Sequence, residues 1–170
     1  MFIGLLSDTH GSLDEQVFNF FSDCDEIWHA GDVGNPMVLD ALEKFKPVVA
    51  VYGNIDDHQI RVRTREHQRR VRNGMEVWMT HIGGYPGNYD RRVWPQIMSS
   101  PPGLFISGHS HILKVMHDKK LGLLHINPGA AGYHGLHKVR TAVRFRIHEK
   151  RIQDLDVIEL GPRSRISEQQ

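Results

Sequence analysis

Cysteine is nearly missing from this sequence, since the 170 residues include only Cys24. A single thiol excludes an internal disulfide framework and a zinc site built on cysteines, and it fits a reducing compartment. Long apolar runs are absent as well, because no stretch approaches the roughly 18–20 residues that a membrane span requires. Residues 1–6 carry no basic leader and the chain turns polar at Ser7, which argues against a secretory signal. We therefore expect a cytoplasmic protein without a membrane partner.

An excess of charge of one sign is also missing. Lys plus Arg number 21 and Asp plus Glu number 20, a formal net charge of +1, so nothing global indicates nucleic acid as a partner. Hydrophobic residues at 39% and charged residues at 24% are ordinary values that exclude a disordered chain. The length predicts one domain over residues 1–160 with a frayed tail over 161–170. Histidine, in contrast, is abundant, with 12 residues.

Short apolar runs alternate with turn-forming residues in the first fifty positions. Strands and helices are expected, in chain order, at Met1–Leu6, Leu13–Phe21, Glu26–His29, Met37–Phe45 and Val48–Tyr52. Ser12 is the expected N-cap of the first helix, with Glu15 at its third position. This β-α-β-α-β order is typical of a parallel sheet with right-handed crossovers.

Hairpins dominate the second half of the sequence. Asn73-Gly74 indicates a type I′ turn between the two strands at 68–72 and 75–80. The remaining expected elements are a helix at Asp90–Met98, a strand at Leu104–Ser107, and hairpins at 113–127 and 141–160. Asp90 is expected to cap that helix, and Pro95 to limit or kink it. The prediction is a mixed α/β domain whose second sheet is mainly antiparallel.

Chemically active side chains follow five of the expected strands directly, usually beside glycine. They are two carboxylates, four imidazoles and a carboxamide, namely Asp8, His10, Asp32, Asn54, His81, His109 and His111. Because sites in α/β sheets collect at the carboxyl ends of strands, we expect these side chains at one edge. Each motif alone is common turn chemistry, but all five in this order favour one joint site.

These donors suit two divalent cations. Carboxylates, imidazoles and a carboxamide are compatible with Mn²⁺, Fe, Co, Ni or Zn, and the lack of thiolates argues against a purely structural zinc. His109 and His111 are two positions apart, as are Asp8 and His10, so in extended backbone each pair would point to one side. Two carboxylates opposite two divalent cations leave a net positive charge that attracts a phosphate ester. A metal pair about 3.5–4 Å apart can also ionise water for an in-line displacement.

One family shares this ordered set of motifs. The chain resembles the calcineurin-like metallophosphoesterases in Asp8-x-His10, Gly31-Asp32, Gly53-Asn54, His81 and Gly108-His109-Ser110-His111. Asn127-Pro128-Gly129 and the closing hairpin resemble the small YfcE-like phosphodiesterase branch, and the likeness extends from residue 1 to about residue 160. The resemblance implies an α/β fold, a four-layer α/β/β/α sandwich of two mixed sheets flanked by helices. It also implies a bimetal hydrolase, usually with Mn²⁺, in which a metal-bridging hydroxide attacks phosphorus.

The resemblance further implies a division of the ligands. One cation would be held by Asp8, His10, Asp32 and His111. The other would be held by Asp32, Asn54, His81 and His109, with Asp32 bridging the two. Asp32, Asn54 and His109 are the expected catalytic residues, and a small-molecule phosphoester is the expected substrate.

The sequence departs from the family at two positions. Many members follow Gly-Asn with a histidine that protonates the leaving oxygen or steadies the phosphoryl group, whereas this chain has Ile55, and the nearest imidazole is His58. Without a dedicated acid, good leaving groups are favoured, so we predict a phosphodiesterase rather than a monoesterase. After His81, where relatives often carry Gly-His, the chain continues with Ile82. The metal ligand is retained, but a second phosphate contact is lost.

Three other functions are compatible with this pattern. A phosphomonoesterase or a nuclease would share the superfamily, and the repair exonucleases among them carry DNA-binding segments for which 170 residues leave no room. A non-catalytic scaffold would resemble the retromer subunit, which keeps the fold but has lost ligands. Every ligand type is retained in this chain, which favours an enzyme.

Several further residues are candidates for secondary roles. Six arginines between positions 61 and 72 are interpreted as a solvated face rather than a nucleic-acid surface. Candidates for pocket or substrate contacts are Tyr85, Tyr89, His134 and His137. Trp78 and Trp94 are candidates for a homodimer contact.

Overall fold

Three parallel strands joined by two helices form the first half of the protein. The computed structural model describes residues 1–164. The elements, in chain order, are β1 (Phe2–Leu6), α1 (Glu15–Phe20), β2 (Glu26–His29), α2 (Pro36–Phe45) and β3 (Val48–Ala50). Strand β2 pairs in parallel with both β1 and β3, so the expected β-α-β-α-β order is confirmed.

The first helix starts later than expected. Helix α1 begins at Glu15, and its N-cap is Asp14, whose carboxylate accepts a hydrogen bond from the amide of Gln16. Leu13 therefore lies outside the helix, and the expectation that Ser12 is the cap is wrong. A carboxylate caps a helix as well as a serine hydroxyl does, and Asp14 is also held by Arg140 at 3.0 Å.

Five strands form the second sheet, in the order β4-β5-β8-β10-β9. Their bounds are β4 His67–Arg72, β5 Met75–Thr80, β8 Leu104–Ile106, β9 Leu113–Asp118 and β10 Leu123–Pro128. The two hairpins, β4 with β5 and β9 with β10, are antiparallel, but β8 pairs in parallel with both β5 and β10. The expectation of a mainly antiparallel sheet is therefore wrong, because the hairpins are joined through a central strand that runs parallel to its neighbours.

The closing hairpin belongs to the first sheet. Strand β11 (Val139–His148) pairs antiparallel with β1 and with β12 (Arg151–Pro162), which gives the order β12-β11-β1-β2-β3. The expected tail therefore begins too early, since Gly161 and Pro162 complete β12. Residues 165–170 of that tail lie outside the described residues.

Helix α4 (Trp94–Ser99) is shorter than the helix expected at Asp90–Met98. Asp90 bonds the amide and guanidinium of Arg92 in the preceding turn instead of capping the helix. Pro95 lies in the first helical turn, where a missing N–H costs nothing. It therefore helps to start the helix, and the expectation that it limits or kinks the helix is wrong.

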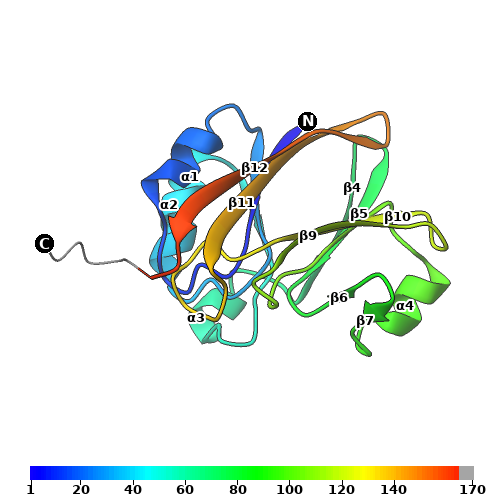
Figure 1. Ribbon diagram of the computed structural model, residues 1–170, viewed down its shortest axis with the longest axis horizontal. Helices are drawn as coiled ribbons and strands as arrows, with labels where there is room; N and C mark the ends of the chain where they lie inside the picture. Colours follow the sequence, from blue (N-terminus) through cyan, green and yellow to red (C-terminus); the bar gives the residue numbers. More distant parts are fainter. Residues whose placement is uncertain (165–170) are drawn as a thin grey trace, which may run out of the picture.

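The sheets and helices stack in four layers (Figure 1). Helices α1 and α2 cover the outer face of the first sheet, around a core that includes Leu6, Phe21 and Leu39. The two sheets enclose a second apolar core. Helix α4 lies outside the second sheet, where Trp78, Ile97 and Phe105 form a third cluster. The α/β/β/α arrangement of two mixed sheets is confirmed.

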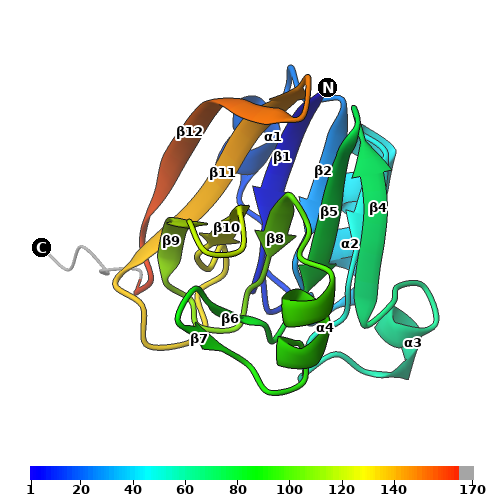
Figure 2. The same cartoon turned by 90° about the vertical axis from the view of Figure 1, so that its right-hand side faces the viewer.

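Smaller elements surround the sheets at one end (Figure 2). They are helix α3 (His58–Arg61) and the short strands β6 (Gly84–Tyr85) and β7 (Asn88–Tyr89), which pair with each other. Trp78 is buried in the core with 1% of its surface exposed, so the expectation that it covers a dimer contact is wrong. Trp94 is 47% exposed, and its role in a homodimer stays a prediction.

Candidate metal centre

Six of the seven expected ligand residues form two adjacent groups at the ends of four strands. One group is Asp8, His10 and His111, and the other is Asp32, His81 and His109. Within each group the potential ligand atoms all lie within 4.8 Å of one another. The loops that carry them follow β1, β2, β5 and β8. The convergence that the motif order predicted is therefore present in the fold.

Asn54 stands at the rim of this cluster. It follows β3 and is exposed, and it lines a small cavity together with Gly53 and His81. The backbone amide of the next residue, Ile55, donates a hydrogen bond to Asp32 Oδ1 at 3.1 Å. The loop after β3 is therefore attached to the second group.

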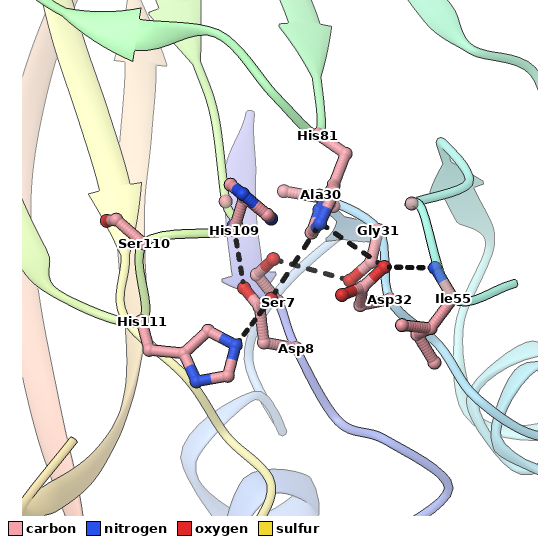
Figure 3. A network of polar contacts seen from close by, with 12 residues as sticks. Ser7, Asp8, Ala30, Gly31, Asp32, Ile55, His81, His109, Ser110 and His111 are labelled. Carbon is pink, nitrogen blue, oxygen red and sulfur yellow. Dashed lines mark hydrogen bonds and ion pairs between the residues drawn. The ribbon is translucent and has the colours of Figure 1, made fainter. Parts of the chain in front are cut away.

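The two groups meet at the carboxylates of Asp32 and Asp8 (Figure 3). Asp32 Oδ1 lies 3.2 Å from His81 Nε2, and Asp32 Oδ2 lies 3.8 Å from His10 Nε2. Asp8 Oδ1 lies 3.1 Å from His111 Nε2 and 3.9 Å from His81 Nε2. Asp32 thus faces histidines of both groups with different oxygens.

The backbone that presents these side chains is left-handed rather than extended. Positive φ values occur at five of the seven expected ligands, namely Asp8 (54°), His10 (46°), Asp32 (52°), His109 (67°) and His111 (58°). Such values are uncommon for residues with a Cβ and concentrate at functional sites. The expectation of extended backbone is wrong, and His109 and His111 point into different groups.

Two glycines permit the close approach of neighbouring loops. A Cβ at Gly31 would lie 2.6 Å from His81 Nδ1, and a Cβ at Gly53 would lie 1.9 Å from Asp32 Oδ1. A side chain at either position would displace a residue of the second group. The Gly-Asp and Gly-Asn motifs therefore reflect packing against the site as well as turn chemistry.

Hydrogen bonds fix the protons of two of the histidines. His81 Nδ1 lies 2.8 Å from the carbonyl oxygen of Ala30. Since a carbonyl only accepts, Nδ1 carries the hydrogen and Nε2 of the neutral ring presents a lone pair to the carboxylates. This arrangement is usual for metal-binding histidines.

His111 is oriented through a longer chain of hydrogen bonds. His137 Nε2 donates to the carbonyl oxygen of Gly132 at 3.0 Å, which leaves His137 Nδ1 as an acceptor. That acceptor lies 3.2 Å from His111 Nδ1, so His111 Nδ1 carries the hydrogen. The lone pair of His111 Nε2 then faces Asp8 Oδ1.

The buried atoms at the centre lack hydrogen-bond partners. Within residues 1–164, Asp8 Oδ1, His10 Nε2 and His81 Nε2 are buried without a hydrogen bond. Lone pairs of nitrogen facing carboxylate oxygens at 3–4 Å are unfavourable unless a proton or a cation lies between them. The donor set therefore fits bound metal ions, and its nitrogen and oxygen atoms suit divalent transition metals.

Burial and charge adjust the protonation of these groups. Burial alone would raise the pKa of Asp32, but in the metal-free protein the imidazole of His81, when protonated, interacts with the carboxylate and holds that pKa below its usual range. Burial lowers the pKa values of His10 and His109. For His81 burial acts in the same direction, but the nearby carboxylates of Asp32 and Asp8 outweigh it and raise the pKa. Asp32 ionised with His10 and His109 neutral is the state that binds a cation.

A buried carboxylate outside the cluster fixes two of its loops to each other. Asp56 is 3% exposed and accepts hydrogen bonds from the amides of Val33 (3.1 Å), Gly34 (2.8 Å) and Gly53 (2.8 Å). It thereby joins the loop after Asp32 to the loop before Asn54. Asp56 is not among the residues expected at the site, and its position two residues after Asn54 is the signal in the sequence that points to it.

Two cavities flank the centre. A smaller one of about 230 Å³ is lined by Tyr52, Asn54, Arg61 and His81. A larger one of about 570 Å³ is lined by Tyr85, Tyr89, His109 and Lys114. Ile82 and Arg92 line both cavities. Tyr85 and Tyr89, which the sequence suggested as pocket residues, are therefore placed beside the site.

The candidates outside the strand-end motifs have different surroundings. The ring of His134 lies 4.7 Å from that of His10, centroid to centroid, at the exposed edge of the centre. His58 begins α3 and is exposed. Ile55 is 46% exposed, so an apolar side chain lies at the rim of the site.

Three of the six arginines in the arginine-rich segment, Arg63, Arg69 and Arg72, form ion pairs at the surface. Arg63 contacts Asp40 and Glu43 at 2.8 and 2.7 Å. Arg72 lies 3.3 Å from Glu26. Such pairs support the prediction of a solvated face, whereas Arg61, stacked 4.7 Å over Tyr52, reaches the smaller cavity.

No helix within residues 1–164 is both long enough and apolar enough to span a membrane.

Residues 1–150 match the calcineurin-like phosphoesterase superfamily domain. A probable metallophosphoesterase from Methanothermobacter thermautotrophicus is 31% identical over 137 residues, which cover 76% of this chain and 77% of that protein. A probable metallophosphoesterase from Methanocaldococcus jannaschii is 33% identical over 137 residues, with 76% of this chain and 68% of that protein covered.

Solved structures share the fold at lower identity. An archaeal phosphodiesterase superposes with a TM-score of 0.75 at 22% identity, covering 94% of this chain and 100% of that one. A single mutant of Vps29 from Entamoeba histolytica superposes with a TM-score of 0.72 at 15% identity, covering 95% of this chain and 100% of that one. These similarities concern the arrangement of strands and helices.

Proposed function

Because the chain belongs to the calcineurin-like phosphoesterase superfamily, we propose that it is a phosphodiesterase that works with two divalent cations. The observation that carries this proposal is the pair of ligand groups, whose buried lone pairs lack hydrogen-bond partners in the described residues. Mn²⁺ is the first candidate metal, and Fe, Co, Ni and Zn suit the same donors.

The proposed ligands follow the two groups. Asp8, His10 and His111 bind one cation and His81, His109 and Asn54 the other, while Asp32 bridges them. The distances from Asp32 to His10 and His81 support its bridging role. Asn54 joins the second set because its loop is attached to Asp32 through the amide of Ile55.

The reaction is hydrolysis of one ester bond of a phosphodiester. When bound, the cations supply a nucleophile from water and withdraw charge from the phosphate. Asp32, Asn54 and His109 are the proposed catalytic residues, since they would hold the second cation close to the rim where the reacting phosphate would bind. Water adds to phosphorus and releases a proton to solvent, the ester P–O bond breaks, and the departing alkoxide takes a proton from solvent.

The missing acid determines the preferred substrates. Ile55 has no proton to give to a leaving oxygen, so esters of acidic alcohols react faster than esters of ordinary alcohols. The net positive charge of two divalent cations and two carboxylates attracts the anionic phosphate of either a diester or a monoester. The lack of an acid at Ile55 is therefore what supports a diesterase over a phosphomonoesterase.

A scaffold without catalysis is the alternative from a different class. A scaffold has no need for buried polar atoms without hydrogen-bond partners, and those of Asp8, His10 and His81 in the described residues therefore support an enzyme. The likeness to Vps29, at 15% identity, concerns the fold alone. A nuclease is less well supported, because three of the six arginines of positions 61–72 are paired with acidic residues.

The buried thiol of Cys24 is compatible with a reducing compartment such as the cytoplasm.

The phosphodiesterase proposal is tested by steady-state assays with Mn²⁺ that compare bis-p-nitrophenyl phosphate with p-nitrophenyl phosphate. We expect a higher kcat/KM for the diester. A clear preference for the monoester would contradict the diesterase proposal, and an inactive protein that binds no metal would support the scaffold.

A further inference from the structure

The larger cavity lies between the outer face of the second sheet and the segment that follows His81. Its walls include the hairpin β6–β7 and the turn before α4, which lie below the strands β8 and β10 in Figure 2. Its volume of about 570 Å³ is within the usual range for ligand sites. His109 and Gly108 line its inner end, so the cavity opens directly beside the proposed metal centre.

His125 is a buried acceptor in the wall of this cavity. It is 1% exposed, and its Nε2 lies 3.0 Å from Ser107 Oγ. Ser107 gives its own proton to the carbonyl oxygen of Gly84 at 3.1 Å, so Nε2 must be the donor to Ser107 Oγ. The other ring nitrogen, Nδ1, therefore carries a lone pair, and it has no hydrogen-bond partner within residues 1–164.

A fixed positive charge lies on the same cavity wall. Lys114 Nζ lies 3.4 Å from the centre of the Tyr85 ring, in a cation–π contact. Lys114 lies directly opposite Asn127 in the pairing of β9 with β10, and Asn127 is two residues from His125 along β10. Lys114 is close enough to His125 to help burial lower the pKa of the imidazole to about 4. The acceptor is therefore neutral at pH 7.

We infer that this cavity binds an alkyl arm of the diester that carries hydroxyl groups, such as a polyol or a sugar. A hydroxyl can form hydrogen bonds with both groups, because it donates to His125 Nδ1 and accepts from Lys114 Nζ. A cationic arm is repelled by Lys114, and a carboxylate has no proton for His125. The inference rests on the proposed phosphodiesterase function, and it assigns the larger cavity to one ester group.

The smaller cavity on the opposite side of Ile82 provides space for the other ester group. Its volume of about 230 Å³ is less than half that of the cavity at His125, and Tyr52 offers it an aromatic wall. A diester with its phosphate at the metal centre can thus extend one arm into each cavity. Arg92, which lines both, is bound to Asp90 at 2.7 Å and stays between the two arms.

The experiment compares two diesters that share a chromophoric leaving group. The probes are p-nitrophenyl 2,3-dihydroxypropyl phosphate and p-nitrophenyl propyl phosphate, assayed with Mn²⁺ after subtraction of the rate without protein. We expect kcat/KM to be at least about tenfold higher for the dihydroxypropyl ester, as one or two neutral hydrogen bonds provide. Equal values for the two esters would overturn the inference, whereas hydrolysis of neither would overturn the proposed function itself.

Substitutions then assign the preference to the cavity wall. Lys114→Met and His125→Phe should each reduce the ratio between the two esters while the propyl ester is still hydrolysed. Lys119→Met, on the exposed turn between β9 and β10, is the matched control and should keep the full ratio. If the ratio of kcat/KM between the two esters is unchanged in both cavity variants, the hydroxyl groups bind elsewhere and the inference is overturned. The comparison on the unmodified protein stands even if His125→Phe fails to fold.

Discussion

His137 fixes the proton of His111, because the Nδ1 atoms of the two rings lie 3.2 Å apart and only one of them can donate. His137 uses its own hydrogen on the carbonyl oxygen of Gly132, so His111 is the donor. The consequence is that His111 Nε2 presents its lone pair to the first ligand group. A histidine 26 residues away in the chain thus determines how a proposed metal ligand is oriented.

Replacement of His137 should weaken metal binding without removing a ligand. We expect His137→Ala to lower the affinity for Mn²⁺ about 10–100-fold, as is typical for partners that orient a ligand. His137→Gln should recover most of it, since an amide can donate to Gly132 and accept from His111. Competition with a chromophoric chelator measures the affinity. His148→Ala, at an exposed site, is the control, and unchanged affinity in His137→Ala would contradict the orienting role.

Asp32 is expected to be indispensable for turnover but not for folding. Asp32→Asn should reduce kcat at least about a thousandfold, because the proposed bridging carboxylate would hold the two cations whose charge stabilises the transition state. The thermal unfolding midpoint of the metal-free protein should stay near that of the unmodified chain, whereas the rise that Mn²⁺ causes should vanish. Asp40→Asn, which alters an exposed ion pair, should retain both. Near-normal turnover in Asp32→Asn would contradict the proposed centre.

Loss of the Asp56 carboxylate should destabilise the protein. Three buried amides, those of Val33, Gly34 and Gly53, would lose their acceptor in Asp56→Ala. We expect the free energy of unfolding to fall by about 3 kcal/mol, measured by urea denaturation. The matched control is Asp57→Asn, one residue along, because asparagine replaces aspartate as the cap of α3 with a change below about 0.5 kcal/mol. Equal effects of the two substitutions would contradict this role of Asp56.

Protonation of His125 should make the protein less stable in acid. Burial lowers the pKa of this imidazole from 6.5 to about 4, so between these values the unfolded chain binds more protons than the folded one. The free energy of unfolding that depends on neutral His125 is fully present above pH 6.5 and declines as the pH falls toward 4. The total loss is on the order of 3 kcal/mol. In urea denaturation of the metal-free protein, His125→Gln should show a shallower loss of stability over this range. His117→Gln, at an exposed position on β9, should follow the unmodified protein.

Local sequence signals predicted the elements whose geometry is determined by neighbouring residues. Asn73 and Gly74 have positive φ values of 45° and 76°, as a type I′ turn requires, and the hairpin of β4 and β5 is confirmed. The signals failed where distant residues compete. Asp14, rather than Ser12, caps α1 while also bonding Arg140, which is 126 residues away. The direction of β8 was likewise unpredictable, because both of its neighbours in the sheet come from other parts of the chain.

The sequence by itself determined the types and order of the side chains at the centre, because each follows a strand whose apolar pattern marks its end. Only the tertiary structure decided how these side chains are distributed between the two ligand groups. The left-handed backbone at His109 and His111 sends these two neighbours to different groups, and Asp56 joins loops that lie about twenty residues apart. The physical reason is that hydrogen bonds between distant loops overcome the intrinsic preference of each residue for extended or right-handed backbone, and no local pattern encodes them.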